Sequence, residues 1–220
     1  MAEALCAAGM RVTITGRDDA ALREAVVAIE AAAQGAGEVW AAVADVRDPA
    51  ALRAAAEGTV ARFGGIDLVV ANAGVGHFGS VVDMDPADWQ RVLDTNLTGV
   101  FHTVQATLPA LMARSGLLIT IGSLAGVNAF AGGSAYNASK FGLVGFTHAI
   151  MLDLREHGVR VSSIMPGSVA THFNGRAPRP EDGWKLQGED IADAVLYLAR
   201  CEERALPSKI EMRPSLPKKA

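Results

Sequence analysis

The sequence has few cysteines and no long apolar run. Its two cysteines, Cys6 and Cys201, lie in separate apolar segments of helical period and show no metal-binding or redox spacing. We therefore expect both thiols to be reduced core residues. Because no run of about 18 apolar residues occurs and the segment after Met1 lacks a basic start, neither a membrane span nor a secretion signal is predicted. The expected location is the cytoplasm.

The sequence also has little excess of charge of one sign. The 220 residues include 20 Lys and Arg against 24 Asp and Glu, a net charge of -4, and the Lys218-Lys219 pair is too short for a basic patch. This balance disfavours a nucleic-acid or anionic-membrane surface. The five histidines show no metal-ligand spacing, so no metal site is expected. Hydrophobic residues make up 50% of the sequence, which is sufficient for one domain with a sizeable core over residues 1–220.

Apolar runs of strand length alternate with segments of helical period along the chain. The expected strands are residues 11–15, 38–44, 66–71, 117–121, 160–164 and 209–212. The expected helices are residues 20–33, 49–63, 86–114, 134–157 and 189–200. Strict alternation predicts βαβ units, and therefore an α/β fold with a doubly wound parallel sheet covered by helices on both faces.

Ser123, Tyr136 and Lys140 form the most informative pattern. Ser123 follows the apolar run 117–121, and open α/β sheets bind ligands beyond the carboxyl ends of their strands. Tyr136 and Lys140 are four residues apart in a helical segment, so their side chains share one face. A neighbouring ammonium favours the phenolate and would lower the tyrosine pKa from about 10 toward the range of a general acid/base. An isolated pair of this spacing is usually a solvated helix face, but the serine at the strand end favours a catalytic site.

Five motifs in the same order and spacing resemble the short-chain dehydrogenase/reductase family, over the whole chain. Besides Ser123 and Tyr136-Asn-Ala-Ser-Lys140, they are Asn72-Ala-Gly74, Asp94-Thr-Asn-Leu-Thr-Gly99 and Pro166-Gly-Ser-Val-Ala-Thr171. Each motif alone is weak, whereas the combination is specific. The resemblance implies a Rossmann-like fold and an oxidoreductase that uses a nicotinamide cofactor.

The resemblance also implies roles for individual residues. Tyr136 would protonate the carbonyl oxygen, Ser123 would hydrogen-bond it, Lys140 would hold the ribose and lower the Tyr136 pKa, and Asn96 would support a proton-relay water. The implied cofactor contacts are Asp45, Val46, Asn72, Ala73, Gly74, Tyr136, Lys140, Pro166, Gly167, Val169 and Thr171.

Arg17 indicates which cofactor is used. In this fold an acidic residue at the end of the second strand binds the ribose 2′-hydroxyl of NAD, whereas a nearby arginine accommodates the 2′-phosphate of NADP. Gly16 stands at the acidic position and Arg17 follows it. A guanidinium forms charge-assisted bonds with phosphate, so we predict NADP(H) rather than NAD(H). A solvated turn is the alternative role for Arg17.

The start of the chain departs from the family pattern. Family members open with a strand and a Gly-rich turn that binds the cofactor pyrophosphate, whereas residues 1–9 resemble the later part of the helix that follows. Because that strand is central, we expect segments 11–15 and 66–71 to lack their shared neighbour. Either the gene product starts upstream of Met1, which we favour because the catalytic set is whole, or the chain is a degenerate member.

The implied function is NADP(H)-dependent reduction of a ketone or aldehyde, or oxidation of the matching secondary alcohol. Gly76, His77, Phe78 and Phe173 are candidates for an apolar substrate pocket, with core packing as the alternative for both phenylalanines.

Segment 175–183, rich in Gly and Pro, is predicted to be a mobile loop over the substrate. Helices 86–114 and 134–157 resemble dimerisation helices, which implies a homodimer or homotetramer. The alternative function is a non-catalytic nucleotide-sensing or scaffold protein.

Overall fold

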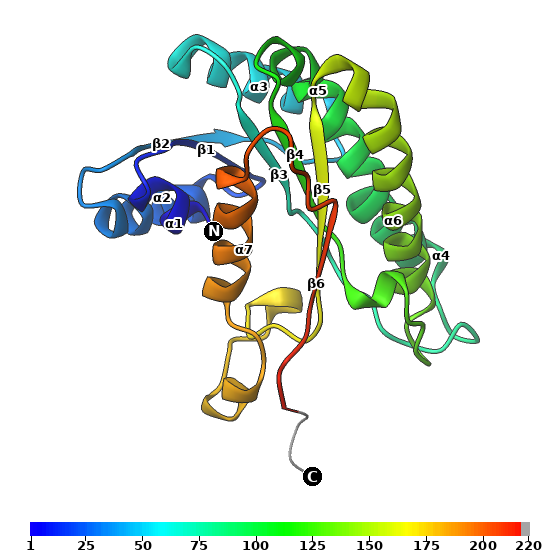
Figure 1. Cartoon of the computed structure of the whole chain (residues 1–220). Coiled ribbons are helices and arrows are strands. Elements are labelled where there is room, and N and C mark those ends of the chain that lie inside the picture. The colour runs from blue at the N-terminus through cyan, green and yellow to red at the C-terminus, as the bar shows by residue number, and fades with distance from the viewer. Residues whose placement is uncertain (217–220) are drawn as a thin grey trace.

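The computed structural model describes residues 1–216 and places parallel strands between two layers of helices (Figure 1). The strands belong to two sheets. One sheet pairs β1 (Arg11–Gly16) with β2 (Glu38–Val43). The other contains, in spatial order, β3 (Leu68–Ala71), β4 (Leu117–Ile121), β5 (Arg160–Pro166) and β6 (Lys209–Met212). The α/β class with parallel strands is as predicted.

The division into two sheets is the main difference from a single doubly wound sheet. Strand β1 pairs only with β2, and β3 pairs only with β4, among the residues that the structure describes. Where a strand shared by β1 and β3 would lie, the two strands border one cavity of about 900 Å³. The expectation that segments 11–15 and 66–71 lack a common partner is therefore confirmed.

Helices cover both sides of the strands. Figure 1 shows α1 (Ala2–Ala7), α2 (Asp19–Ala33) and α7 (Gly188–Arg200) on the side opposite to α5 (Gly99–Ala113) and α6 (Ser134–Leu154), and α3 (Pro49–Phe63) packs against α5. Aspartates cap the starts of α2 and α3, since Asp18 and Asp48 each accept a hydrogen bond from a first-turn backbone N–H. Pro49 then occupies the first turn of α3, where no intrahelical N–H bond is lost.

The segment predicted as one helix over 86–114 is interrupted. Helix α4 (Pro86–Leu93) leads into a π-helical turn, η1 (Asp94–Thr98), before α5 begins. Asn96 in this turn is fully buried and bonds the backbone of Val75, which lies outside the helix. Such single π turns interrupt α-helices mostly at functional sites. The predicted helix over 134–157 likewise ends earlier, at Leu154, and continues as a 3₁₀ turn, η3 (Arg155–His157).

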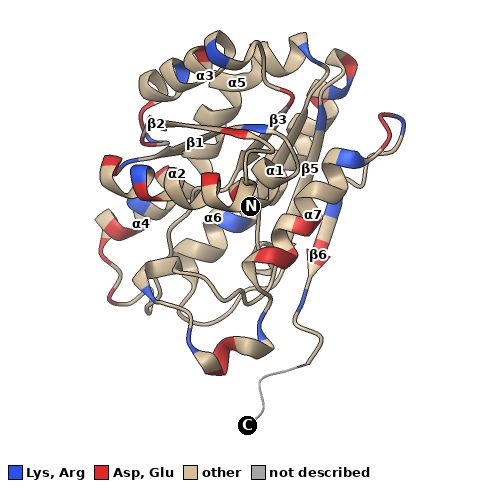
Figure 2. Ribbon diagram, turned by 90° about the vertical axis from the view of Figure 1, so that its left-hand side faces the viewer, with Lys and Arg blue, Asp and Glu red and all other residues tan. Residues whose placement is uncertain are grey.

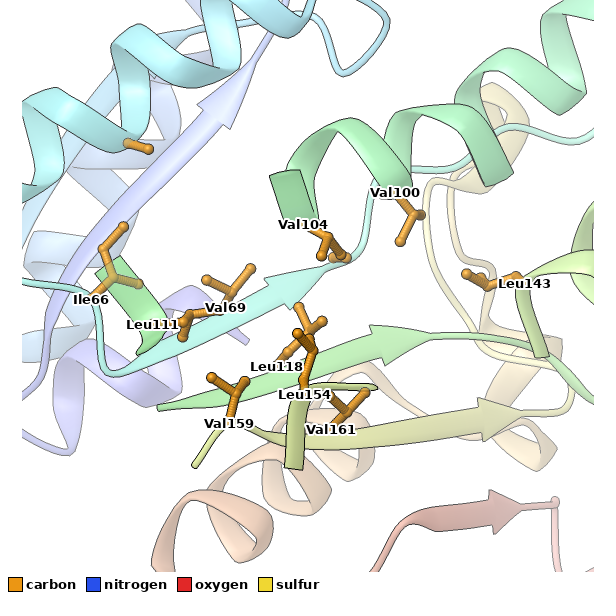
Figure 3. Close-up of a cluster of buried hydrophobic side chains, with 12 residues drawn as sticks. Ile66, Val69, Val100, Val104, Leu111, Leu118, Leu143, Leu154, Val159 and Val161 are labelled. Carbon is orange, nitrogen blue, oxygen red and sulfur yellow. The ribbon is translucent and has the colours of Figure 1, made fainter. Parts of the chain in front are cut away.

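The core lies on both sides of β4 and β5. On one side, Val100 and Val104 of α5 point toward Val69 and Leu118 on the strands (Figure 3). On the other, α7 packs Val195 and Leu198 against these strands. Strands buried on both faces read as continuous apolar runs, which explains why 117–121 was predictable. This packing holds the carboxyl ends of β4 and β5, where the candidate site begins.

The remaining expectations from composition have mixed outcomes. Acidic and basic residues are interspersed over the helices and loops (Figure 2). None of the helices within residues 1–216 is both long and apolar enough to cross a bilayer. Both thiols are free; Cys6 is buried as expected, whereas Cys201 is only partly buried. Lys218-Lys219 lies outside the described residues.

The loop predicted over 175–183 is not irregular throughout. Two 3₁₀ turns, η4 (Phe173–Gly175) and η5 (Pro180–Trp184), flank a short extended stretch. Asp182 helps to order the second turn, since its carboxylate lies 2.7 Å from the Lys185 ammonium and accepts the Arg179 backbone N–H. The segment therefore has local structure of its own.

Candidate active site

Ser123, Tyr136 and Lys140 meet at the carboxyl end of β4. Ser123 follows the strand, and the first turns of α6 present Tyr136 and Lys140 on one face. The Ser123 hydroxyl is near enough to the Tyr136 phenol to act on its pKa, and its oxygen accepts the Ala125 backbone N–H at 3.1 Å. Lys140 Nζ donates to the backbone oxygen of Ile121 at 2.9 Å and lies 5.9 Å from the centre of the Tyr136 ring. The structure thus brings together the three side chains that the sequence singled out.

Burial dominates the protonation of this group. It lowers the pKa of Lys140 from 10.5 to about 8, because the ammonium is removed from water. It also raises the pKa of Tyr136 above its ordinary value of 10, and the Ser123 hydrogen bond opposes this only in part. The lowering of the Tyr136 pKa that the sequence suggested is therefore not found in the chain without cofactor. Tyr136 keeps its proton at neutral pH and can donate it.

Asn96 is linked to Tyr136 through a buried hydrogen-bond path. Its Nδ2 donates to the Val75 backbone oxygen at 2.8 Å and to Ser139 Oγ at 3.1 Å. Ser139 Oγ in turn donates to the Tyr136 backbone oxygen at 2.8 Å. Asn96 thus joins the loop after β3 to the start of α6. Ser139, the middle residue of this hydrogen-bond path, was missed by sequence reasoning.

Aromatic rings surround the Tyr136 phenol on its open side. The ring centres of Phe78 and Phe173 lie 5.4 and 6.0 Å from that of Tyr136. Phe130, which the sequence did not indicate, lies 6.0 Å from Phe78. Phe78 and Phe173 are 50% and 39% exposed, so core packing is not their role. Exposed apolar rings beside this phenol form a surface suited to an apolar ligand.

The two other candidates for the substrate pocket lie next to these rings. The Gly76 backbone N–H donates to Asn174 Oδ1 at 2.9 Å, and a Cβ at Gly76 would come within 2.9 Å of the Phe78 and Phe173 rings. A larger residue at this position would therefore displace these side chains. His77 Nδ1 lies 3.4 Å from the carboxylate of Asp88.

The candidate cofactor contacts follow the carboxyl ends of the strands. Arg17 comes after β1, Asp45 and Val46 after β2, Asn72, Ala73 and Gly74 after β3, and Pro166, Gly167, Val169 and Thr171 at and after the end of β5. Parallel strands place these positions along one edge. These positions remain candidates for contacts at the two ends of a dinucleotide. In the described part of the chain, no strand pairs with both β1 and β3. The central phosphates of a dinucleotide therefore lack the backbone N–H groups that a turn after such a strand would supply.

Comparison with known proteins assigns the family. The family described as short chain dehydrogenase matches residues 1–182. The chain belongs to this family. Among its relatives, a trans-4-hydroxycyclohexanecarboxylate dehydrogenase of Sinomonas cyclohexanicum is 38% identical over 165 residues, 72% of this chain and 62% of that enzyme. An uncharacterized NAD-dependent oxidoreductase of Mycobacterium tuberculosis is 40% identical over 152 residues, 68% of this chain and 54% of that protein. The chain thus spans less than two thirds of the length of these two relatives.

Solved structures agree with the fold of this short-chain dehydrogenase. A metagenomic short-chain oxidoreductase in complex with NADP is 37% identical and superimposes with a TM-score of 0.84. The match covers 98% of this chain and 90% of that one. The two sheets therefore keep, across the cavity between them, an arrangement close to that in the metagenomic protein.

Asn137 is a further residue beside the candidate site that sequence reasoning missed. Its Nδ2 donates to the backbone oxygens of Ala125 and Asn128 at 2.7 and 3.2 Å, and its Oδ1 accepts from the Phe130 N–H at 3.3 Å. These bonds tie the loop after Ser123 to α6 beside Tyr136. The available signal was a short polar residue inside a helix, where asparagine is unfavourable without local partners.

Asp45 has a partner that the sequence did not indicate. The Arg47 guanidinium lies 2.7 Å from the Asp45 carboxylate and hydrogen-bonds both of its oxygens. This interaction, supported by the charge of Arg17, lowers the pKa of Asp45 to about 2. Within residues 1–216, Arg17 itself forms no ion pair. In the described part of the chain, Arg47 is therefore paired with a carboxylate, whereas Arg17 is not.

Proposed function

We propose that this short-chain dehydrogenase uses NADP(H) to interconvert a ketone or aldehyde and the matching alcohol. The observation that carries the proposal is the placement of Ser123 beside the Tyr136 phenol, with the buried Lys140 ammonium 5.9 Å from the centre of the Tyr136 ring. This arrangement supplies a hydrogen-bond donor, an acid and a charge around one point. The two relatives are named as a dehydrogenase and an oxidoreductase, which is compatible with this reaction class.

Each residue has a distinct task in the proposed mechanism. Tyr136 donates its proton to the carbonyl oxygen, which Ser123 holds by a hydrogen bond. Lys140 contacts the ribose and stabilises the phenolate left on Tyr136, and Asn96 positions a water that returns the proton. A bound nicotinamide cofactor supplies or accepts the hydride. In the reverse direction Tyr136 acts as the base.

Arg17 supports NADP(H) as the preferred cofactor. Its side chain follows β1 without a carboxylate partner in the described part of the chain, while Asp45 is engaged by Arg47. A free guanidinium at this position suits a 2′-phosphate. The metagenomic neighbour is a complex with NADP, whereas the M. tuberculosis relative is named as NAD-dependent, so the preference is a proposal for this chain.

The substrate that we propose is a ring ketone with an acidic substituent. The exposed rings of Phe78, Phe130 and Phe173 offer an apolar surface beside Tyr136. A second cavity, of about 640 Å³, is bordered by Phe173 and by the basic side chain of Arg176, while the Lys185 ammonium at this cavity is paired with Asp182. The Sinomonas relative is named for a hydroxycyclohexanecarboxylate, which has these two features.

The test is consumption of NADPH or NADH with 4-oxocyclohexanecarboxylate, cyclohexanone and acetone. We expect turnover with NADPH above NADH and with the ring ketones above acetone. Tyr136→Phe, prepared in parallel, controls for contaminating reductases. If NADPH quenches the fluorescence of the tryptophans but no ketone consumes it, the chain is a nucleotide-binding protein without this activity, and the proposal is wrong.

We further propose that the enzyme is a homodimer or homotetramer. The outer faces of α5 and α6 expose Phe101, Phe141 and Leu152. Large apolar side chains gathered on exposed helix faces mark protein interfaces. Light scattering after gel filtration measures the mass; Phe141→Lys should shift it toward the monomer, and an unchanged monomeric mass for the wild type would contradict the proposal.

A further inference from the structure

Residues 171–184 form a segment that one side chain ties to the body of the protein. The Gly76 backbone N–H donates to Asn174 Oδ1 at 2.9 Å, across 98 positions of the sequence. In the described part of the chain, the other hydrogen bonds and ion pairs of residues 171–184 stay within residues 171–187. The Asn174 side chain is therefore the one polar tether between this segment and the loop after β3.

The backbone at Asn174 limits which residues can supply this tether. Asn174 has φ 59° and ψ 31°, in the left-handed region that few residues other than glycine, asparagine and aspartate adopt readily. The Gly175 N–H donates to the His172 backbone oxygen at 3.0 Å and closes the turn. Glycine fits this backbone but has no side-chain acceptor. Asparagine and aspartate fit it and can also accept the Gly76 N–H.

The tether lies where two aromatic walls of the candidate site meet. Phe78 comes from the loop after β3, and Phe173 comes from the segment. Their ring centres lie 5.4 and 6.0 Å from that of Tyr136. A Cβ at Gly76 would lie 2.9 Å from Asn174 Nδ2 and 2.9 Å from a carbon of each phenylalanine ring. The lack of a side chain at Gly76 thus allows both rings to lie close to the tether.

The two walls differ in how they are held. The loop that carries Phe78 is joined to the backbone just before α6, because the Gly79 N–H donates to the Gly132 oxygen at 2.8 Å. Helix α6 carries Tyr136, so this wall has a fixed position relative to the phenol. Phe173, in contrast, belongs to the segment with the single polar tether. Its position beside the phenol therefore depends on that hydrogen bond.

We propose that Asn174 is a positioning residue that makes the site select ring ketones over small acyclic ones. By holding Phe173 next to the phenol, its side chain completes an apolar surface to which Phe78 also contributes. A six-membered ring with its carbonyl at Tyr136 brings three more carbon atoms to this surface than acetone does. Each buried CH₂ group favours binding about fourfold, so full contact favours cyclohexanone by up to about 60-fold. This inference rests on the proposed reaction and adds what sets its substrate class.

The test compares Asn174→Gly with Asn174→Asp, because glycine removes the acceptor and aspartate retains it on the same backbone. The measured quantity is the ratio of kcat/KM for cyclohexanone over acetone, with saturating NADPH. Asn174→Gly should lower this ratio about tenfold, mainly through a higher KM for cyclohexanone, since part of the ring contact is lost. Asn174→Asp should keep the wild-type ratio. Partial unfolding would lower the rates with both ketones equally and leave the ratio unchanged.

Two further variants separate the tether from the flexibility of the segment. Gly76→Ala adds a Cβ that displaces the rings from the other loop, and its backbone φ is not in the left-handed region, so the change is steric. It should lower the ratio as Asn174→Gly does. Ala177→Gly loosens the same segment at an exposed position and keeps the tether, so the ratio should not change. Circular dichroism checks that each variant folds.

NMR of the isotope-labelled chain tests the tether without turnover. Amide hydrogen exchange at Gly76 should be about fivefold faster in Asn174→Gly than in the wild type, because its N–H loses one hydrogen bond. Titration with cyclohexanone in the presence of NADP⁺ then measures affinity from the shift of the Gly76 amide. Asn174→Gly should bind cyclohexanone about tenfold more weakly than Asn174→Asp does.

The proposal is overturned if Asn174→Gly keeps the wild-type ratio, or if Asn174→Asp or Ala177→Gly lowers it as much as Asn174→Gly does. Unchanged exchange at Gly76 in Asn174→Gly would also overturn it. A wild type that turns over no ketone, together with weaker cyclohexanone binding by Asn174→Gly, would reject only the proposed reaction. No turnover with equal binding by both variants would reject the reaction and the role of Asn174 together.

Discussion

Replacing Lys140 with methionine should make the protein more stable and inactive. The Lys140 residue is only 6% exposed, and in the described part of the chain its ammonium donates one hydrogen bond, to the Ile121 backbone oxygen at 2.9 Å. Methionine is apolar, unbranched and similar in length, so it can occupy the same space. The substitution removes the buried charge and its hydrogen bond together.

The size of the effect follows from the pKa. Burial lowers the Lys140 pKa from 10.5 to about 8, so the charged form destabilises the folded state by about 3 kcal/mol at pH 7. Losing the hydrogen bond to Ile121 offsets about 1 kcal/mol, which leaves a net gain of about 2 kcal/mol. Because the folded pKa is lower than the unfolded pKa, wild-type stability rises between pH 8 and pH 10.5. At pH 10 the penalty is about 1 kcal/mol, and Lys140→Met should match the wild type.

Urea unfolding of the wild type and of Lys140→Met at pH 7 and pH 10 measures this difference in unfolding free energy. The contributions of other titrating groups cancel in the difference, because both proteins contain them. Turnover at pH 7 should fall by at least about 10²-fold, since the phenolate of Tyr136 loses its stabilising charge. A Lys140→Met protein that is less stable than the wild type at pH 7 would refute the reasoning. So would a stability difference that is the same at both pH values.

Three further substitutions test individual roles. Tyr136→Phe should lower turnover by ~10²–10⁴-fold with NADPH binding retained, and more than about a tenth of the wild-type rate would exclude it as the acid. Arg17→Asp should shift the ratio of kcat/KM for NADPH over NADH toward NADH, because a carboxylate repels the 2′-phosphate; an unchanged ratio would exclude the contact. Asn137→Ala should lower kcat more than it raises KM, because the loop bearing Ser123 is released from α6, and kcat equal to that of the wild type would leave Asn137 without a positioning role.

Local patterns determined most of the secondary structure. The predicted bounds 117–121, 209–212 and 49–63 agree with β4, β6 and α3, because apolar runs, an aspartate cap and a first-turn proline are signals within the segment itself. The convergence of Ser123, Tyr136 and Lys140 was also predictable, from helical spacing and the position after a buried strand. The helix over 86–114 was wrong, because its π turn depends on Asn96 bonding the distant Val75 backbone.

The order of the elements and the residues of the candidate site at the end of β4 can thus be read from the sequence alone. Tertiary structure decided the exposed rings around Tyr136, the partners of Asn137 and Asp45, and the cavity between β1 and β3. It also decided the sign of the Tyr136 pKa shift, since burial outweighs the expected influence of Lys140. Periodicity and capping report on neighbours within one or two turns, whereas desolvation and strand pairing depend on residues that only the folded chain brings together.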